Sequence, residues 1–296
     1  MDKFKILNRI KTVYENGGNI IRYLKDLEGQ SNNSLEDILI SYDFQAGSYI
    51  KAYEKEPKIK DMYCEKLAEI IDDIGDYDSL IEVGVGEATT LGNVLKLIRN
   101  KSVTSYGFDI SWSRIKYAKK FLQKQNLSNV NLFVADLFCL PLKDNCIDIV
   151  YTSHSIEPNG GKEREALMEL YRITNKYLIL LEPAYELANE EARNRMRHYG
   201  YVTNLYSMAN DLGYNIIEHK LFGINTNPLN PTGLIIIKKD GKAKETNLTC
   251  CPVTKKDLIL INNCYFSEES FLLYPIVEGI PCLLPQNAIL ATKFLD

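Results

Sequence analysis

Long hydrophobic runs are missing from this sequence of 296 residues. No stretch approaches the roughly 20 apolar residues that a membrane-spanning helix needs. The first five residues, MDKFK, do not resemble the apolar core of a signal peptide. We therefore expect a cytoplasmic protein that does not enter a membrane.

Cysteine pairs of the C-x-x-C type are also missing, although the chain has 7 cysteines. The number is odd and no two are separated by two residues, so we expect neither a disulfide framework nor a paired-cysteine metal site. A formal net charge of −4 argues against a broad basic surface for nucleic acid. The remaining composition is that of a globular protein, long enough for one large domain and a small one.

A glycine turn between an apolar run and a helical pattern is the clearest local feature. Residues 79–83 are expected to form a strand, and apolar residues recur at helical spacing over 88–99. Gly84 and Gly86, between them, would let the backbone pass close under a ligand, as in nucleotide-type cofactor sites. The alternative is an ordinary glycine turn at a strand–helix junction.

Glu82 discriminates between classes of cofactor. A dinucleotide places its pyrophosphate on helix N–H groups, where a carboxylate is unfavourable. Thr89 stands where the dinucleotide motif needs its third glycine. S-adenosylmethionine has no phosphate and carries a sulfonium and an ammonium, which an acidic residue attracts. The residues Glu82-x-Gly84-x-Gly86-x-Ala88 resemble the first motif of the class I methyltransferases, with Ala88 in place of a third glycine.

Two further acids end the next two predicted strands. Asp109 could accept hydrogen bonds from both ribose hydroxyls, or it could simply precede a helix N-terminus. The resemblance implies that Asp136 binds the adenine amino group, that Leu137 meets the ring and that Ile110 also contacts the cofactor. Together with Glu82, these acids would lie on one carboxyl edge of a parallel sheet, where such folds bind ligands.

The order of strands and helices predicts an α/β fold. Strands and helices alternate from residue 79 to about residue 240, and no helix fits between the last two strands, which should therefore pair antiparallel. The resemblance implies a Rossmann-like sheet of seven strands with the last one antiparallel, in a domain over 76–240 behind a helical cap or lid over 1–75. The strands are expected at 79–83, 103–109, 130–135, 146–152, 177–182, 214–221 and 232–238.

The end of the fourth predicted strand carries candidate catalytic residues. His154 is one of 3 histidines and would face the transferred methyl group in this family. As a neutral base, His154 could take the proton of a hydroxyl acceptor, with Glu157 as a second base or as the partner that orients the imidazole. Alternatively, His154 only shapes the pocket and Ser153 or Ile156 lies against the adenine, because methyl transfer often needs no base.

Residues after the fifth predicted strand are expected on the acceptor side, as is the segment 223–233. Arginines there could bind an anionic acceptor, or they could form a solvated helix face paired with Glu190 and Glu191. The candidate acceptor residues are Glu182, Tyr185, Arg197 and Tyr199.

The N-terminal segment is expected to be helical, with a break at Gly17-Gly18. Residues 1–30 would pack on the rest of the chain or form the contact of a homodimer. Residues 41–53 resemble a Tyr-Asp-x-x-Ala-x-x-Tyr stretch that forms a lid over the methionine end of the cofactor in small-molecule methyltransferases. Tyr42 and Tyr49 match that pattern; an aromatic helix face packed on the core is the alternative.

A polar stretch over 239–246 precedes a C-terminal unit over 247–296. This unit resembles the small zinc-ribbon activator subunit of tRNA and protein methyltransferases, chiefly through the signature YPIVEGIPCLL at 274–284. A zinc ribbon needs four thiolate or imidazole ligands, but Thr254 and Ser267 stand where cysteines would be, so we expect no metal. We expect the unit to dock on the catalytic domain in cis, with strand addition as one way of doing so.

Three functions follow from these patterns. The first is S-adenosylmethionine-dependent methyl transfer to a small molecule, such as a sugar or a nucleotide-linked metabolite of surface polysaccharide. The second is a tRNA or translation-factor methyltransferase with a fused activator. Against the second, Ser155-Ile-Glu-Pro158 stands where an Asn-Pro-Pro-Tyr-like motif would hold a planar nitrogen acceptor. The third is a non-catalytic scaffold that binds the cofactor.

Overall fold

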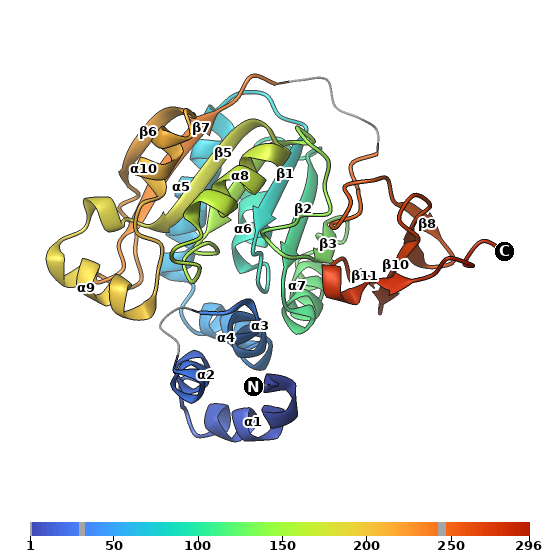
Figure 1. Ribbon diagram of the computed structural model, residues 1–296. Helices are drawn as coiled ribbons and strands as arrows, with labels where there is room; N and C mark the ends of the chain where they lie inside the picture. The colour runs from blue at the N-terminus through green and yellow to red at the C-terminus, as the bar shows by residue number, and fades with distance from the viewer. Residues whose placement is uncertain (1, 30–32, 242–246) are drawn as a thin grey trace.

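A seven-stranded sheet forms the centre of the computed structural model, which describes residues 2–29, 33–241 and 247–296 (Figure 1). The strand order is β3-β2-β1-β4-β5-β7-β6. Strands β1 to β5 are all parallel to their neighbours among these five, whereas β7 runs antiparallel to both β5 and β6. This arrangement confirms the predicted sheet. The strands are β1 (Ser79–Val83), β2 (Thr104–Asp109), β3 (Asn131–Val134), β4 (Ile147–Ser153), β5 (Thr174–Pro183), β6 (Asn215–Leu221) and β7 (Thr232–Lys238).

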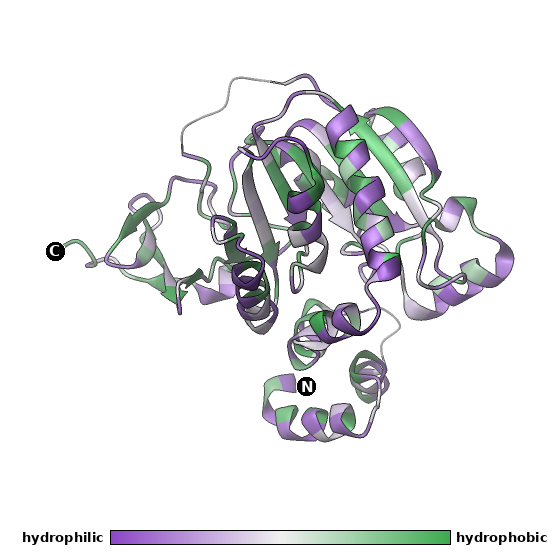
Figure 2. Cartoon of the chain, turned by 180° about the vertical axis from the view of Figure 1, so that it is seen from behind, coloured by the Kyte–Doolittle hydropathy of each residue, from purple (hydrophilic) through white to green (hydrophobic). Residues whose placement is uncertain are grey.

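Helices cover both faces of this sheet, because its central strands are apolar on both sides. Successive residues of β1 illustrate this: Leu80 packs with one layer and Ile81 with the other. Several strands are green along most of their length in Figure 2, whereas the helices mix green and purple. One layer contains α5 (Lys58–Asp73), α6 (Thr89–Leu97) and α7 (Trp112–Lys124); the other contains α8 (Glu163–Ile173) and α10 (Leu205–Asp211).

Four short helices form a cap beside the carboxyl edge of the sheet (Figure 1). The expected break at the glycine pair lies between α1 and α2, with Gly17 at φ 75°. At the start of α3, Ser34 and Asp37 form a capping box, which satisfies two N–H groups of the first turn. The first three of these helices share a small core of their own around Ile10 and Leu24. The four helices are α1 (Leu7–Glu15), α2 (Ile20–Glu28), α3 (Leu35–Phe44) and α4 (Ser48–Lys55).

The C-terminal unit is a small sheet in the order β11-β10-β9-β8, with β12 also paired to β10. Residues 242–246 of the polar stretch before it lie outside the described residues. No group of three or more His, Cys, Asp or Glu side chains gathers at metal-binding distance in the described ranges. The strands are β8 (Ile259–Ile261), β9 (Cys264–Ser267), β10 (Leu272–Val277), β11 (Ile280–Pro281) and β12 (Ile289–Leu290).

This unit lies against β3, the edge strand of the large sheet (Figure 1). Cys282 forms a parallel bridge with Val134, and the Leu283 N–H donates to the Val134 carbonyl at 2.9 Å. Tyr274 and Leu283 are buried in the same cluster as residues of β1, β4 and α8. The unit thus covers an edge whose unpaired N–H and C=O groups would otherwise be open to another strand.

Membrane insertion by a helix finds no support in the structure. Among the residues that the structure describes, no helix combines the length and apolar character that a bilayer crossing needs.

Candidate functional site

A cavity of about 680 Å³ lies between the cap and the carboxyl ends of the central strands. Both parts of the chain contribute to its wall: α3 and α4 from one side, and the loops after β1, β2, β3 and β4 from the other. The structure therefore brings most of the predicted site residues to one place. Those that line the cavity are Tyr42, Tyr49, Gly84, Gly86, Asp109, Ile110, Asp136, Leu137, Ser153, His154 and Glu157.

The glycine turn forms part of the cavity wall in a conformation that favours glycine. Gly84 and Gly86 have φ angles of 61° and 54°, in the left-handed region. A side chain at Gly84 would also collide with Ser155, whose Cβ would lie 2.4 Å from the added atom. The close approach of the loop after β1 to the loop after β4 therefore requires glycine at this position.

Asp109 and Asp136 are held in place by backbone N–H groups. The Asp109 carboxylate accepts from the N–H of Gly86 at 3.0 Å and of Ser111 at 2.9 Å. The Asp136 carboxylate accepts from the Phe138 N–H at 3.0 Å. Burial raises the pKa of both carboxyls above the ordinary value. The carboxylate oxygens at these two strand ends are held in place and only partly hydrated. They can therefore accept hydrogen bonds from hydroxyl or amino groups of a ligand.

Glu82 does not line the cavity, and this corrects the role expected for it. Its side chain is 2% exposed and accepts a hydrogen bond from the Tyr151 hydroxyl at 2.9 Å. Burial raises the pKa of Glu82 to about 7, although the charge of Lys60 opposes the rise. Glu82 is therefore buried behind the turn as a hydrogen-bond acceptor and does not face a cationic ligand directly.

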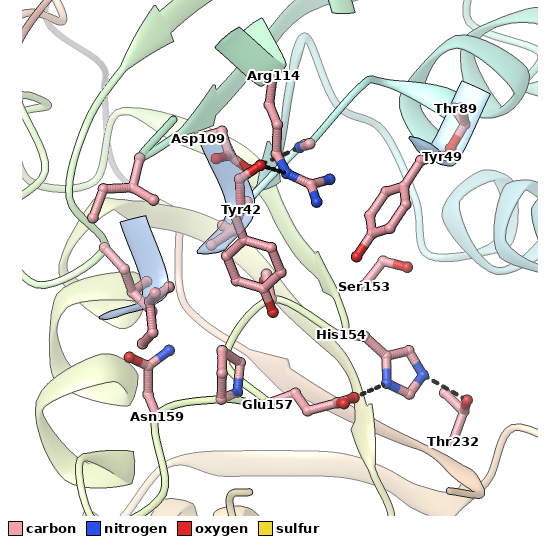
Figure 3. A pocket seen from close by; sticks show the side chains of 18 of the residues that line it. Tyr42, Tyr49, Thr89, Asp109, Arg114, Ser153, His154, Glu157, Asn159 and Thr232 are labelled. Carbon is pink, nitrogen blue, oxygen red and sulfur yellow. Dashed lines mark hydrogen bonds and ion pairs between the residues drawn. The ribbon is translucent and has the colours of Figure 1, made fainter. Parts of the chain in front are cut away.

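Arg114 also lines the cavity, although no sequence pattern indicated it. The side chain is 1% exposed and its guanidinium lies 4.8 Å and 4.2 Å from the ring centres of Tyr42 and Tyr49 (Figure 3). Nε donates to the Tyr42 carbonyl at 3.0 Å, and Nη1 lies 3.7 Å from Glu87 Oε1. Nη2 is buried and has no hydrogen-bond partner among the described residues. An unsatisfied cationic donor in a cavity indicates an acceptor on the ligand.

Glu87 joins the glycine turn to the cap. Its carboxylate accepts from the backbone N–H groups of Gly47, Tyr49 and Ile50, at 2.9, 3.2 and 2.8 Å. These donors precede or begin α4, so the carboxylate also complements the positive end of that helix. On the other side of the cap, Asp43 accepts from the Ser111 hydroxyl at 2.7 Å. Two carboxylates thus fasten the cap over the cavity.

His154 and Glu157 form a hydrogen-bonded chain with Thr232 (Figure 3). His154 Nδ1 lies 2.5 Å from Glu157 Oε2, and Nε2 lies 2.8 Å from Thr232 Oγ1. Burial alone would lower the pKa of His154, but the hydrogen bond and charge of Glu157, together with the charge of Glu182, raise it. Burial would raise the pKa of Glu157, but His154 lowers it. The pair is therefore favoured as imidazolium and carboxylate.

The expected acceptor residues after β5 do not line the cavity. Glu182 is 3% exposed, and its carboxylate accepts from the N–H groups of Ser155, Ile156 and Glu157 at 3.0 to 3.1 Å. It shapes the loop that carries the His154 pair and does not contact an acceptor.

The other expected acceptor residues also lie away from the cavity lining: Tyr185 begins the short 3-10 helix Tyr185–Leu187, and Arg197 and Tyr199 lie in α9 (Glu190–Tyr199). Arg197 hydrogen-bonds Tyr185, Glu190 and Asn194, which is the self-paired helix face given above as the alternative. Tyr199 is 41% exposed and its ring stacks near that of Tyr201. These contacts explain both side chains without an acceptor.

Comparisons with known proteins agree with this geometry. A family model described as a methyltransferase domain matches residues 75–227, more than half of the chain. A structure described as an S-adenosyl-L-methionine-dependent methyltransferase from Methanococcus maripaludis superposes with a TM-score of 0.50, at 15% identity over 68% of this chain and 95% of that chain.

Two further solved structures are similar to a smaller part of the chain. A SAM-dependent methyltransferase from Aquifex aeolicus is 17% identical, with a TM-score of 0.45 over 57% of this chain and 87% of that chain. Geranyl diphosphate C-methyltransferase from Streptomyces coelicolor is 10% identical, with a TM-score of 0.48 over 58% and 74%. A comparison with curated proteins found no match. On the strength of the family model, the chain belongs to the methyltransferase-domain family and is an S-adenosylmethionine-dependent methyltransferase.

Proposed function

We propose that this enzyme methylates a hydroxyl group of a small, neutral acceptor, such as a sugar or the sugar unit of a nucleotide-linked precursor of surface polysaccharide. The observation that carries the proposal is the chain Glu157–His154–Thr232, which places a proton acceptor in the wall of the cofactor cavity.

The cofactor end of the cavity offers one residue each for the ribose hydroxyls, the adenine amino group and the carboxylate of S-adenosylmethionine. Asp109 suits the ribose hydroxyls and Asp136 the adenine amino group. The unpartnered Nη2 of Arg114 suits the carboxylate, which is the one anion of the cofactor. Arg114, Asp109 and Asp136, when ionised, together carry one net negative charge, which complements the net positive charge of the cofactor. When bound, the cofactor supplies a methyl group activated by the sulfonium.

The other end of the cavity is lined by neutral hydrogen-bonding side chains. Amides and hydroxyls can donate to and accept from sugar hydroxyls without leaving a charge unpaired. An anionic acceptor would meet the Glu157 carboxylate at that end, although Lys60 also lines the cavity and its charge reaches His154. The neutral polar residues are Asn159, Asn225, Thr226, Asn230 and Thr232.

The loop after β4 argues against a planar amide or amine as the acceptor. The backbone N–H groups of residues 155–157 donate to Glu182, so they are not available to hold a flat nitrogen group. In place of an Asn-Pro-Pro-Tyr-like motif, this loop presents the His154–Glu157 pair. A pair that accepts a proton is required by a hydroxyl acceptor more than by a neutral amine.

We propose that the C-terminal unit is a metal-free relative of the zinc-ribbon activators, fused in cis. Cys251 Sγ lies 3.2 Å from the Tyr274 hydroxyl oxygen and 3.9 Å from Ser270 Oγ. Hydroxyl groups therefore surround a single thiol where a ribbon would gather four metal ligands. Its contacts with β3 support a role in protecting the sheet edge.

A methyl-transfer screen tests the proposed function. Purified enzyme and isotope-labelled cofactor are mixed with separate metabolite, RNA and protein fractions, and label is expected in a neutral hydroxylated metabolite. Label only in RNA or protein would contradict the proposal. The cofactor should also raise the melting temperature, Asp109→Ala should abolish that rise, and Asp211→Ala, at an exposed carboxylate on α10, should leave it intact.

A further inference from the structure

Both ring nitrogens of His154 are occupied, which limits how it can act. Nδ1 is bonded to Glu157 and Nε2 to Thr232 (Figure 3). A histidine that takes a proton directly from an acceptor needs a ring nitrogen facing that acceptor. In this site Nε2 faces the Thr232 hydroxyl, and Thr232 also lines the cavity.

We propose that Thr232 relays the proton of the acceptor hydroxyl to His154, an inference that rests on the proposed function. The acceptor oxygen forms its bond to the methyl carbon as the carbon–sulfur bond of the cofactor breaks. The acceptor proton passes to Thr232 Oγ1, and the proton of Thr232 passes to His154 Nε2. The positive charge of the sulfonium is thereby replaced by that of an imidazolium beside the Glu157 carboxylate.

The hydrogen-bond partners give this chain its direction. Glu157 Oε2 also accepts from Asn230 Nδ2 at 3.1 Å, which holds the carboxylate as an acceptor. Nδ1 of His154 must then carry a hydrogen, and in the neutral ring the lone pair lies on Nε2, facing Thr232. The Thr232 hydroxyl donates to that lone pair, so its own lone pairs are left for the acceptor hydroxyl.

The backbone holds both ends of the relay. His154 has a φ of 56°, a left-handed conformation that a non-glycine residue adopts at a cost. Its N–H donates to the Leu181 carbonyl at 2.8 Å, which fixes the turn that points the imidazole toward β7. Thr232 begins β7 and its N–H donates to Asn225 Oδ1 at 3.1 Å. Thr232 is only 2% exposed, so its hydroxyl has little access to bulk water.

The charges around His154 fit a base that works at mildly alkaline pH. Glu157 and Glu182 raise its pKa, while burial and the charge of Lys60 act in the opposite direction. The relay requires the neutral imidazole, whose fraction grows as the pH rises through the raised pKa. The rate should therefore increase with pH above the ordinary value of 6.5 for histidine.

Nitrogen-15 NMR of the cofactor-free protein tests the hydrogen-bond chain without any turnover. In the wild type above the pKa of His154, neutral His154 should carry its hydrogen on Nδ1, and Thr232→Val should shift the Nε2 resonance. His154→Gln identifies the signal. If the neutral ring carries its hydrogen on Nε2 in the wild type, the proposed direction of transfer is wrong.

Kinetics of two Thr232 variants then test the relay. Thr232→Val should lower the single-turnover rate of methyl transfer by roughly 10²-fold or more with little change in cofactor affinity, whereas Thr232→Ser, which retains a hydroxyl, should keep most of that rate. Equal rates and equal pH profiles for Thr232→Val and wild type would overturn the relay. If wild type methylates no hydroxylated acceptor, the proposed function fails, and the NMR experiment still decides the hydrogen-bond direction.

Discussion

Replacing Glu82 with Gln should make the protein more stable at alkaline pH than the wild type is. Glu82 is buried behind the glycine turn, and its pKa is raised from 4.5 to about 7. A carboxyl with a raised pKa contributes stability that is fully present below the pKa of the unfolded chain. That stability is lost as the pH rises through the folded value. The wild type must therefore lose stability between these two pH values, whereas Gln at this position does not ionise.

The size of the effect follows from the shift. At 1.36 kcal/mol per pKa unit, a shift from 4.5 to about 7 corresponds to about 3 kcal/mol at full ionisation. Part of this free energy is already lost at pH 5, where the Glu82 carboxyl of the unfolded chain is mostly ionised. Between pH 5 and pH 8.5, the unfolding free energy of Glu82→Gln relative to wild type should therefore rise by about 2–3 kcal/mol.

Urea unfolding of both proteins at a series of pH values measures this difference. Glu191→Gln, which removes an exposed carboxylate from α9, controls for the loss of one negative charge. Gln retains an oxygen that can accept from the Tyr151 hydroxyl, so the two side chains are matched in shape. A difference between Glu82→Gln and wild type that does not change with pH would refute the raised pKa.

Four further outcomes are expected. Arg114→Lys keeps the charge but loses the planar fork, so calorimetry should show cofactor affinity about tenfold weaker or worse; an unchanged Kd would contradict the carboxylate contact. Glu87→Gln removes the charge that holds the cap, so limited proteolysis should cut between α3 and α4 faster than in wild type. Leu283→Ala should lower the unfolding free energy by about 2–5 kcal/mol, and separate transitions for the two units would argue against their shared core. The single-turnover rate of methyl transfer should rise with pH through the raised pKa of His154, and a flat single-turnover profile would exclude that base.

The sheet could be predicted from the sequence because its signals are local. Buried strands alternate with amphipathic helices, and the glycine turn, Asp109 and Asp136 each lie at the end of a predicted strand. Parallel strands bring their carboxyl ends to one edge, so spacing along the chain was enough to predict that these residues meet. The same reasoning placed His154 in the cavity, one residue after β4.

Contacts between distant segments could not be predicted in this way. Thr232 lies 78 positions from His154, and only the pairing of β5 with β7 brings them together. Arg114 occupies an early turn of a helix, where a lone arginine usually points to solvent, and only the cap shows otherwise. Glu182 also fits the strand-end pattern, but the neighbouring loop after β4 supplies three N–H donors to its carboxylate, so it is a structural acceptor.

The position of Glu87, immediately after Gly86, has a consequence for the rate of the catalytic cycle. Lifting the cap would leave a buried carboxylate without the three N–H donors of residues 47–50, so the open form is high in free energy. Exchange of spent cofactor for fresh cofactor requires that form if the ligand leaves past the cap. We therefore expect the opening of the cap, not the transfer of the methyl group, to limit steady-state turnover, and a burst of product in the first cycle.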